Sequence, residues 1–253
     1  MKGSVFPPMR DRNDLPRRVL CLVAHPDDEV IGIGGLLAFH GARGDEVRVV
    51  HATGGEAGDP EGRHLDLVAQ RREEVRRALG VLGIGPPESL GFEDGRLADQ
   101  GDALEASLGE LFREAAPSLL YTFHGGEFHG DHRSLAERAC AARGALPEEC
   151  RVLLFGVNQP VPFGALYDYS DLLARKKEAL QQFASQLAYL DFATKVLQRD
   201  QAATVNVEDP AVTHAELLLE LGLASWPLHL QHMRLIMEDA FPGNGSGEGR
   251  GTA

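Results

Sequence analysis

The sequence predicts an α/β fold in which a mostly parallel, Rossmann-like sheet is wrapped by helices, with a helical flank at the C-terminus. Short, branched-rich apolar runs alternate with segments of helical periodicity over roughly the first 160 residues. The runs are continuously apolar, as in strands that are buried on both faces of a parallel sheet. A chain of 253 residues is long enough for one large α/β domain.

The first strand is expected at residues 19–24, where an apolar run ends in a polar loop. Glycine or proline closes several of the helices that follow, because neither residue continues a helix well. Further strands are expected at residues 46–52, 89–92, 118–123 and 151–157, and helices at residues 34–41, 65–82, 103–116 and 135–143.

The pattern changes after Pro160, where the regular alternation ends. We expect a helix at residues 172–190, a short strand at 203–207 and a helix at 212–221, which together form the flank. The expected organisation is an N-terminal extension (1–16), a single domain (17–235) and a tail (242–253). The tail is glycine-rich with almost no apolar residue, so we expect it to be disordered.

Composition excludes several classes of function. A net charge of −13 with mixed signs disfavours nucleic acid as a partner, because phosphate binding requires a basic face. The N-terminus lacks the apolar region of a signal peptide, and no stretch is apolar enough to span a bilayer. Three cysteines without a CxxC pair indicate neither a disulfide framework nor a thiolate zinc site. We therefore expect a cytoplasmic protein with a small-molecule substrate and no membrane segment, and the sequence leaves a homo-oligomer open.

The most informative segment follows the first expected strand. His25, Asp27, Asp28 and Glu29 place one imidazole and three carboxylates within five residues. Such crowding of acids is costly without a cation, and zinc binds both imidazole nitrogen and carboxylate oxygen. The alternative is a solvated turn whose acids cap the next helix. Taken alone, this segment favours neither reading, and His25 and Asp28 can supply two metal ligands.

A second cluster, His129-Gly130-Asp131-His132, follows the strand expected at residues 118–123. Open α/β sheets bind their ligands at the carboxyl ends of the strands. Two His/Asp clusters at two such ends favour a shared metal site, and the second cluster can supply the third ligand of a catalytic zinc with one position left for water.

These residues also carry a resemblance to a known family. The chain resembles the PIG-L/LmbE-like deacetylases over most of residues 19–190. The matching motifs are AHPDDE (24–29) followed by Gly32, Gly34 and Gly35, TGGEAG (53–58), RREE (71–74), LGFEDG (90–95), HGDH (129–132), and a late helix with Lys177, Ser185 and Gln186.

The resemblance implies a Rossmann-like domain, a single catalytic Zn²⁺ and hydrolysis of an N-acyl bond, usually the acetyl group of an amino sugar such as N-acetylglucosamine. It implies that His25, Asp28 and His132 are the metal ligands and that Asp27 is the general base. Such a base can take the proton of an attacking water whose pKa a metal lowers. Another divalent metal is left open.

The resemblance further implies that His129 is the acid that protonates the departing nitrogen and helps to stabilise the oxyanion. We expect the Asp131 carboxylate to orient the His129 ring. Arg71 is expected to reach the acyl group or its carboxylate product, which suits a planar guanidinium. A surface position on its helix is the alternative for Arg71.

Two positions depart from the family pattern: Gly130 stands where proline is common, and Glu127 stands where some members carry a tyrosine that assists the intermediate. An ionised carboxylate cannot donate that hydrogen bond. Two other functions remain: a zinc amidase that acts on a non-sugar N-acyl substrate, and a metal-binding homologue without catalysis. The presence of both Asp27 and His129 argues against the second.

Overall fold

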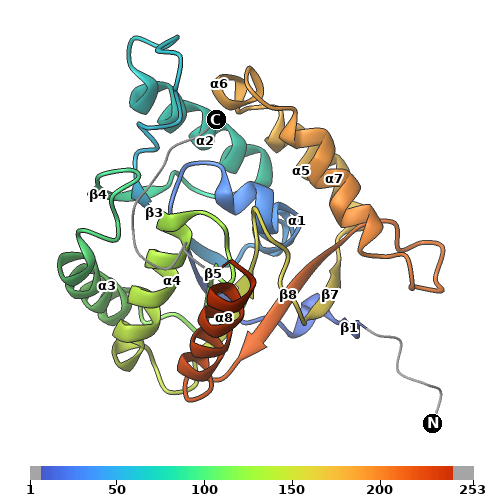
Figure 1. Ribbon diagram of the computed structural model, residues 1–253. Coiled ribbons are helices and arrows are strands. Elements are labelled where there is room, and N and C mark those ends of the chain that lie inside the picture. Colours follow the sequence, from blue (N-terminus) through green and yellow to red (C-terminus); the bar gives the residue numbers. More distant parts are fainter. Residues whose placement is uncertain (1–6, 242–253) are drawn as a thin grey trace.

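A computed structural model describes residues 7–241 of the chain. One eight-stranded sheet has the order β1-β7-β8-β6-β5-β2-β3-β4, and helices flank it (Figure 1). The strands are β1 (Met9–Arg10), β2 (Arg18–Val23), β3 (Glu46–Thr53), β4 (Glu88–Phe92), β5 (Leu119–Phe123), β6 (Arg151–Phe155), β7 (Ala165–Asp168) and β8 (Ala215–Leu221).

The α-helices are α1 (Asp28–Arg43), α2 (Leu67–Leu82), α3 (Gly101–Ala115), α4 (Gly130–Ala141), α5 (Leu173–Leu180), α6 (Ala184–Leu187), α7 (Phe192–Ala202) and α8 (Trp226–Ala240), and short 3₁₀ turns lie at Arg12–Asp14, Ala142–Ala145 and Ser170–Leu172. Helices α1, α2 and α5 pack against one another, and α4 packs against α3 and α8. No helix within residues 7–241 has both the length and the apolar character needed to cross a bilayer.

The centre of the sheet is parallel, as predicted. Strand β2 pairs in parallel with β3 and β5, and β5 pairs in parallel with β6. The apolar residues of β2 and β5 are almost fully buried, which explains why both segments are continuously apolar. Because neighbouring parallel strands end at the same edge, the loops after β2 and β5 meet there.

The prediction of a helix at residues 212–221 was wrong. Residues 215–221 (AELLLEL) form β8, which runs antiparallel between β6 and β7. Alanine, leucine and glutamate all favour helix, but pairing with two strands overrides that preference. The sheet is therefore mixed at this side and parallel at its centre.

Other differences also lie outside the central alternation. The helix predicted at 172–190 is interrupted between α5 and α6, and residues 203–207 continue as turns after α7 instead of forming a strand. Helix α8 and strand β7 were not predicted. Strand β1 pairs with β7, so part of the expected N-terminal extension (1–16) belongs to the sheet. The tail expected to be disordered, 242–253, lies outside the described residues.

Helix α1 begins at the predicted ligand Asp28 and packs closely on the sheet and on the C-terminal segment. A Cβ atom at Gly32 would lie 2.2 Å from the ring of Phe155, and one at Gly35 would lie 2.2 Å from the ring of Tyr169. Only glycine therefore allows this close approach of the helix backbone. The close packing holds the start of α1 at the edge where β2 ends.

Candidate active site

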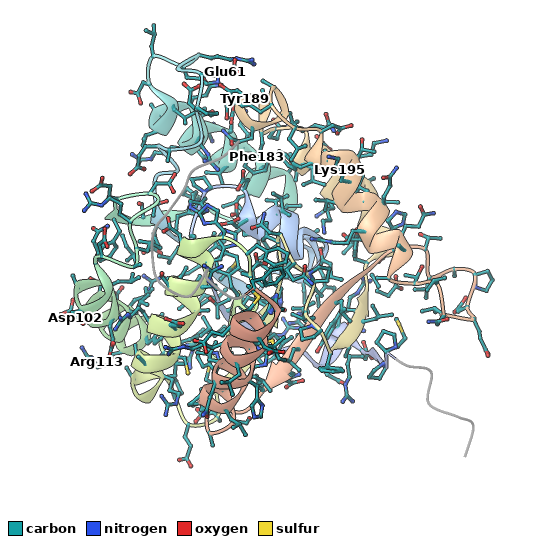
Figure 2. The ribbon with its side chains drawn as sticks, viewed as in Figure 1. Glu61, Asp102, Arg113, Phe183, Tyr189 and Lys195 are labelled. Atoms are coloured by element: carbon teal, nitrogen blue, oxygen red, sulfur yellow. The ribbon has the colours of Figure 1, made fainter. Side chains whose placement is uncertain are left out.

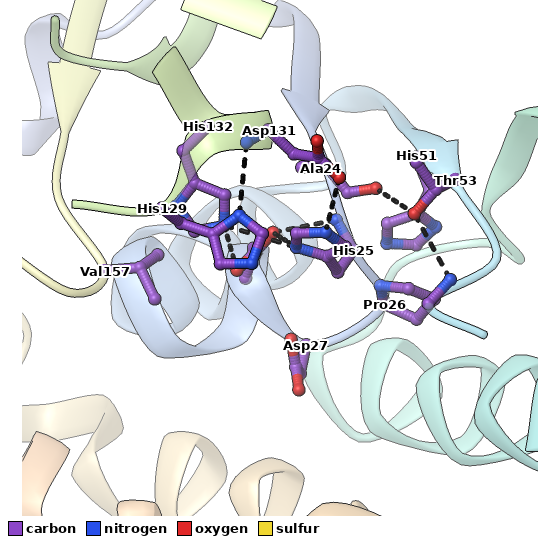
Figure 3. Close-up of polar contacts among 12 residues, drawn as sticks. Ala24, His25, Pro26, Asp27, His51, Thr53, His129, Asp131, His132 and Val157 are labelled. Atoms are coloured by element: carbon purple, nitrogen blue, oxygen red, sulfur yellow. Dashed lines mark hydrogen bonds and ion pairs between the residues drawn. The ribbon is translucent and has the colours of Figure 1, made fainter. Parts of the chain in front are cut away.

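The two predicted His/Asp clusters meet at the carboxyl edge of the central strands. The loop after β2 carries His25, the loop after β5 carries His129, and His132 lies in the first turn of α4. Figure 3 shows the three rings gathered in one place. They line a cavity of about 610 Å³, together with Asp27 and Asp28. The cavity lies where an open α/β sheet is expected to bind its ligand.

The three predicted metal ligands are close enough to share one ion. His25 Nδ1 lies 3.3 Å from Asp28 Oδ2 and 3.2 Å from His132 Nε2. His132 Nε2 lies 3.3 Å from Asp28 Oδ1. Two ligands of a tetrahedral zinc ion are separated by about 3.3 Å, given metal–ligand bonds of about 2.0 to 2.1 Å. The three residues therefore fit a zinc ion with three protein ligands. Two other groups of potential ligand atoms lie within 4.8 Å of one another in the same place: His25, His129 and His132, and His25, Asp94 and Asp131.

The surroundings keep Asp28 in the charged form that a metal binds. Burial opposes ionisation of this carboxyl, but contacts with His132 and His25 outweigh it, and the pKa of Asp28 is held well below its usual range. Burial by itself would lower the pKa of His132. The Asp28 carboxylate outweighs this effect and raises that pKa to about 9. The main-chain N–H of His25 also donates to Asp28 Oδ2 at 2.8 Å, which fixes the carboxylate in the loop.

The second nitrogen of each predicted ligand imidazole faces a carboxylate. His25 Nε2 lies 2.9 Å from Asp94 Oδ1 and 3.4 Å from Asp131 Oδ2. His132 Nδ1 lies 3.2 Å from Glu127 Oε2. Metal-bound histidines usually donate their other ring N–H to such partners, which orients the ring.

Asp27, the predicted base, sits beside the ligands in an unusual backbone conformation. Its φ of 143° is strained for a residue with a Cβ, and such strain is often found at functional sites. Burial raises the pKa of Asp27 to about 7, against the opposing effect of Arg71. In Figure 3, Asp27 lies on the far side of His25 from Asp131. Asp27 also lines the cavity.

Arg71 lines the cavity, and its predicted contact with the acyl group stays a prediction. Its guanidinium donates to Asp27 Oδ2 at 3.0 Å, to the carbonyl oxygen of Pro26 at 2.8 Å and to that of Gly55 at 3.0 Å. The side chain is buried and supports the base and its loop, so the surface position is wrong. The Nε atom of Arg71 is buried without a hydrogen-bond partner among the described residues.

The predicted contact between the Asp131 carboxylate and the His129 ring is replaced by others. Asp131 accepts hydrogen bonds from the main-chain N–H groups of Gly95 (2.6 Å) and Leu97 (3.2 Å), and its carboxylate faces His25. The main-chain N–H of Asp131 donates to His129 Nδ1 at 3.2 Å. A main-chain N–H group at the start of α4 therefore orients the His129 ring.

His129 is the most exposed of the three site histidines, and its second nitrogen is left for the cavity. Burial, with the neighbouring His25 and His132, lowers its pKa. A ring whose Nδ1 accepts a hydrogen bond carries its proton on Nε2 when neutral. His129 can thus present an N–H group to a bound molecule.

Sequence reasoning gave no role to several polar residues of the cavity. Asp94 touches His25 and lines the cavity, and Gln186 lines it from α6. Both residues lie in motifs that carry the family resemblance, so the sequence marks their positions but does not indicate what they do. Figure 2 shows Tyr189 and Lys195 on the segment that follows, and both line the same cavity.

Comparison with known proteins gives the chain a family. Residues 20–143 match the family model PIG-L, described as GlcNAc-PI de-N-acetylase. A probable N-acetyl-α-D-glucosaminyl L-malate deacetylase 2 of Bacillus anthracis is 30% identical over 196 residues, which cover 72% of this chain and 84% of that protein.

Two further relatives extend the comparison. A 1D-myo-inositol 2-acetamido-2-deoxy-α-D-glucopyranoside deacetylase of Kineococcus radiotolerans is 32% identical over 52% of this chain, and the match spans only 46% of that relative. The N,N'-diacetylchitobiose deacetylase of Pyrococcus horikoshii shares the fold with a TM-score of 0.70 at 22% identity, covering 82% of this chain and 85% of the other. The sequence matches, the shared fold and the site geometry agree, and the chain belongs to the PIG-L deacetylase family.

Proposed function

We propose that this chain is a zinc-dependent hydrolase that removes the acetyl group from the nitrogen of an amino sugar or a related small-molecule conjugate. The observation that carries the proposal is the spacing of His25, Asp28 and His132, whose ligand atoms lie 3.2 to 3.3 Å apart in the cavity that Asp27 also lines. Three such ligands with an adjacent base form the arrangement that metal-assisted amide hydrolysis requires.

A divalent ion held by the three ligands would supply Lewis acidity, lowering the pKa of a water and polarising the amide carbonyl. Asp27 takes the proton of the attacking water, and Arg71 holds its carboxylate in place. His129 donates a hydrogen bond from Nε2 to the oxygen that develops charge, since its Nδ1 accepts from the main-chain N–H of Asp131. The proton that Asp27 has taken from the water is the one that the departing nitrogen receives, so the step balances.

The substrate class is supported by the family and by the cavity. The relatives named above act on acetylated glucosamine conjugates, and a cavity of about 610 Å³ has room for a sugar with an attached group. Lys195 and Asn158 also lie on the wall of the cavity, and each offers a polar group to a bound substrate. A non-sugar N-acyl substrate is the second candidate, since the same ligands and base suit the hydrolysis of other N-acyl bonds. Cytoplasmic localisation and a homo-oligomer remain predictions.

Metal content and acetate release test the proposal together. The purified chain is expected to hold about one zinc per chain, and alanine at His25, Asp28 or His132 should abolish that binding because each removes a ligand. His232→Ala, an exposed histidine on α8, is the matched control and should leave the zinc content unchanged. Unchanged metal in all three ligand variants would defeat the site.

Acetate release from a panel of N-acetylglucosamine conjugates and non-sugar N-acetyl amides identifies the substrate class. The sugar conjugates are expected to show the higher kcat/KM. A zinc-loaded chain that hydrolyses only the non-sugar amides would favour the second candidate.

A further inference from the structure

Glu127 is fully buried between a predicted metal ligand and the wall of the cavity. It follows two glycines in the loop after β5 and precedes His129 by two residues. Its Oε2 atom lies 3.2 Å from His132 Nδ1 and accepts a hydrogen bond of 3.2 Å from the main-chain N–H of Asn158. Its Oε1 atom accepts from the main-chain N–H of Val157.

These contacts give the buried carboxylate three donors. A carboxylate in such a place is costly unless it is hydrogen-bonded and faces a cation or a polar N–H group. Glu127 is not among the residues that line the cavity, so its side chain cannot serve the role that tyrosine has in some family members. The structure directs it to the back of His132 instead.

The position of Glu127 sets how His132 faces its neighbours. A neutral imidazole that donates from Nδ1 to a carboxylate presents the lone pair of Nε2 on the other side. His132 Nε2 is the atom that lies near Asp28 and His25. Phe123 stacks on the same ring at 4.0 Å between centroids and 1° between planes, so stacking sets the plane and Glu127 sets the direction within it.

The same carboxylate also holds part of the cavity wall. Val157 and Asn158 line the cavity, and their main-chain N–H groups both donate to Glu127. One side chain thus fixes a ligand on one side and the loop after β6 on the other.

We propose that Glu127 is a positioning residue, which holds His132 in the tautomer and orientation that bind zinc and ties this ligand to the Val157–Asn158 wall. The proposal rests on the function proposed above, because it assumes that His132 is a metal ligand. Outer partners of metal-bound histidine affect metal affinity by about 10-fold to 100-fold.

Zinc affinity, measured by competition with a chelator, tests the proposal without using activity. Glu127→Ala is expected to weaken zinc binding by about 10-fold to 100-fold relative to the unmodified chain. Glu148→Ala, at an exposed position before β6, is the matched control and should bind zinc normally. Unfolding midpoints without and with zinc give a second readout, because zinc should stabilise Glu127→Ala less than the unmodified chain.

Glu127→Gln keeps one acceptor and serves where the alanine variant does not fold. It is expected to bind zinc more tightly than Glu127→Ala, because its carbonyl oxygen can still face His132 Nδ1. Its KM should rise, because the amide group cannot accept from both main-chain donors. Nitrogen NMR of the zinc-loaded chain should show His132 protonated on Nδ1.

Two results would overturn the proposal, and they are distinguishable. If both Glu127 variants bind zinc as tightly as the unmodified chain while losing apo stability, Glu127 supports only the wall and the proposed function stands. If the unmodified chain itself binds no zinc, and His132→Ala changes nothing, the metal site fails and Glu127 loses its role with it.

Discussion

Asp27 combines three features that a general base needs: a carboxylate that lines the cavity, a guanidinium that holds it, and a pKa raised by burial to about 7. Asp27→Asn keeps the shape and the acceptor for Arg71 but cannot take a proton. We expect zinc content to remain and kcat to fall about 100-fold or more, measured by acetate release. Asp99→Asn, on the exposed surface, is the control. Near-normal turnover in Asp27→Asn would remove it from the mechanism.

The contacts of Asp131 change what the sequence predicts for a double mutant. If its carboxylate oriented His129, the two losses would not add, but the carboxylate faces His25 and the His129 ring is held by a main-chain N–H. We therefore expect His129→Ala to lower kcat with zinc retained, and Asp131→Asn to weaken zinc binding through His25 by about 10-fold or more.

The double-mutant cycle of His129→Ala and Asp131→Asn is measured as kcat/KM at saturating zinc. The changes in activation free energy of the two single mutants should be close to additive, because the two side chains belong to different contacts. An Asp131→Asn variant that is slow at saturating zinc by itself, but makes His129→Ala no slower, would restore the orienting role of the carboxylate.

At the scale of elements, the interruption between α5 and α6 brings Ser185 to α2. The Ser185 main-chain N–H and hydroxyl donate to the buried Glu74 carboxylate at 2.9 and 2.6 Å. A continuous helix at 172–190, as predicted, would have no break at this point. The break instead places Gln186 on the cavity wall, and its Nε2 donates to the carbonyl oxygen of Gly58 at 3.3 Å.

Ser185→Ala tests this contact between α2 and α6. Removing the hydroxyl leaves a buried carboxylate short of one donor, and we expect the free energy of unfolding to fall by about 1 to 3 kcal/mol. Urea denaturation measures the change. Gln181→Ala, exposed in the same interruption, should change stability by less than about 0.5 kcal/mol. Equal effects of the two substitutions would contradict the importance of the contact.

At the scale of the whole molecule, one buried lysine joins the C-terminal segment to the helix that carries Asp28. Lys176 on α5 donates to Asp200 on α7 and Glu216 on β8, each at 2.6 Å. Glu216 accepts from the main-chain N–H groups of Gly35 and Leu36 in α1 at 2.7 and 2.9 Å. Gly35 and Leu36 follow Ile33, whose backbone is not helical. The Glu216 carboxylate of β8 therefore accepts the N–H groups of α1 next to this irregular residue. In the sequence, Lys177 was matched to the lysine of the family's late helix. In the structure Lys177 is exposed, and its neighbour Lys176 is buried.

Lys176→Met should destabilise the molecule strongly, because the buried Glu216 carboxylate loses its cation. The Asp200 carboxylate keeps only Arg199 as a cation among the described residues. We expect a loss of about 3 to 5 kcal/mol in the free energy of unfolding, measured by urea denaturation. Lys177→Met, the neighbouring exposed position, should change stability by less than about 0.5 kcal/mol.

The loss in Lys176→Met should shrink as pH falls. Burial and Asp200 already raise the pKa of Glu216 in the folded chain. A carboxyl with a raised folded pKa destabilises the fold above its unfolded pKa, and this penalty is relieved as pH falls through the folded value. A loss independent of pH would show that it arises from packing alone.

The sequence by itself determined the central sheet and the contents of the site. Strands β2 and β5 were predictable because each is a continuous apolar run, and the placement of His25, Asp28 and His132 followed because parallel strands end at one edge. These features depend on local composition and on one general rule of topology.

Only the tertiary structure decided the rest. Residues 215–221 became β8 because two distant strands pair with them, which outweighs their helical preference. The partners of Asp131 and the burial of Lys176 in place of Lys177 depend on side chains that come from separate elements. Such contacts join residues far apart in the chain, so no local pattern reports them, and the structure is needed to show which carboxylate serves which histidine.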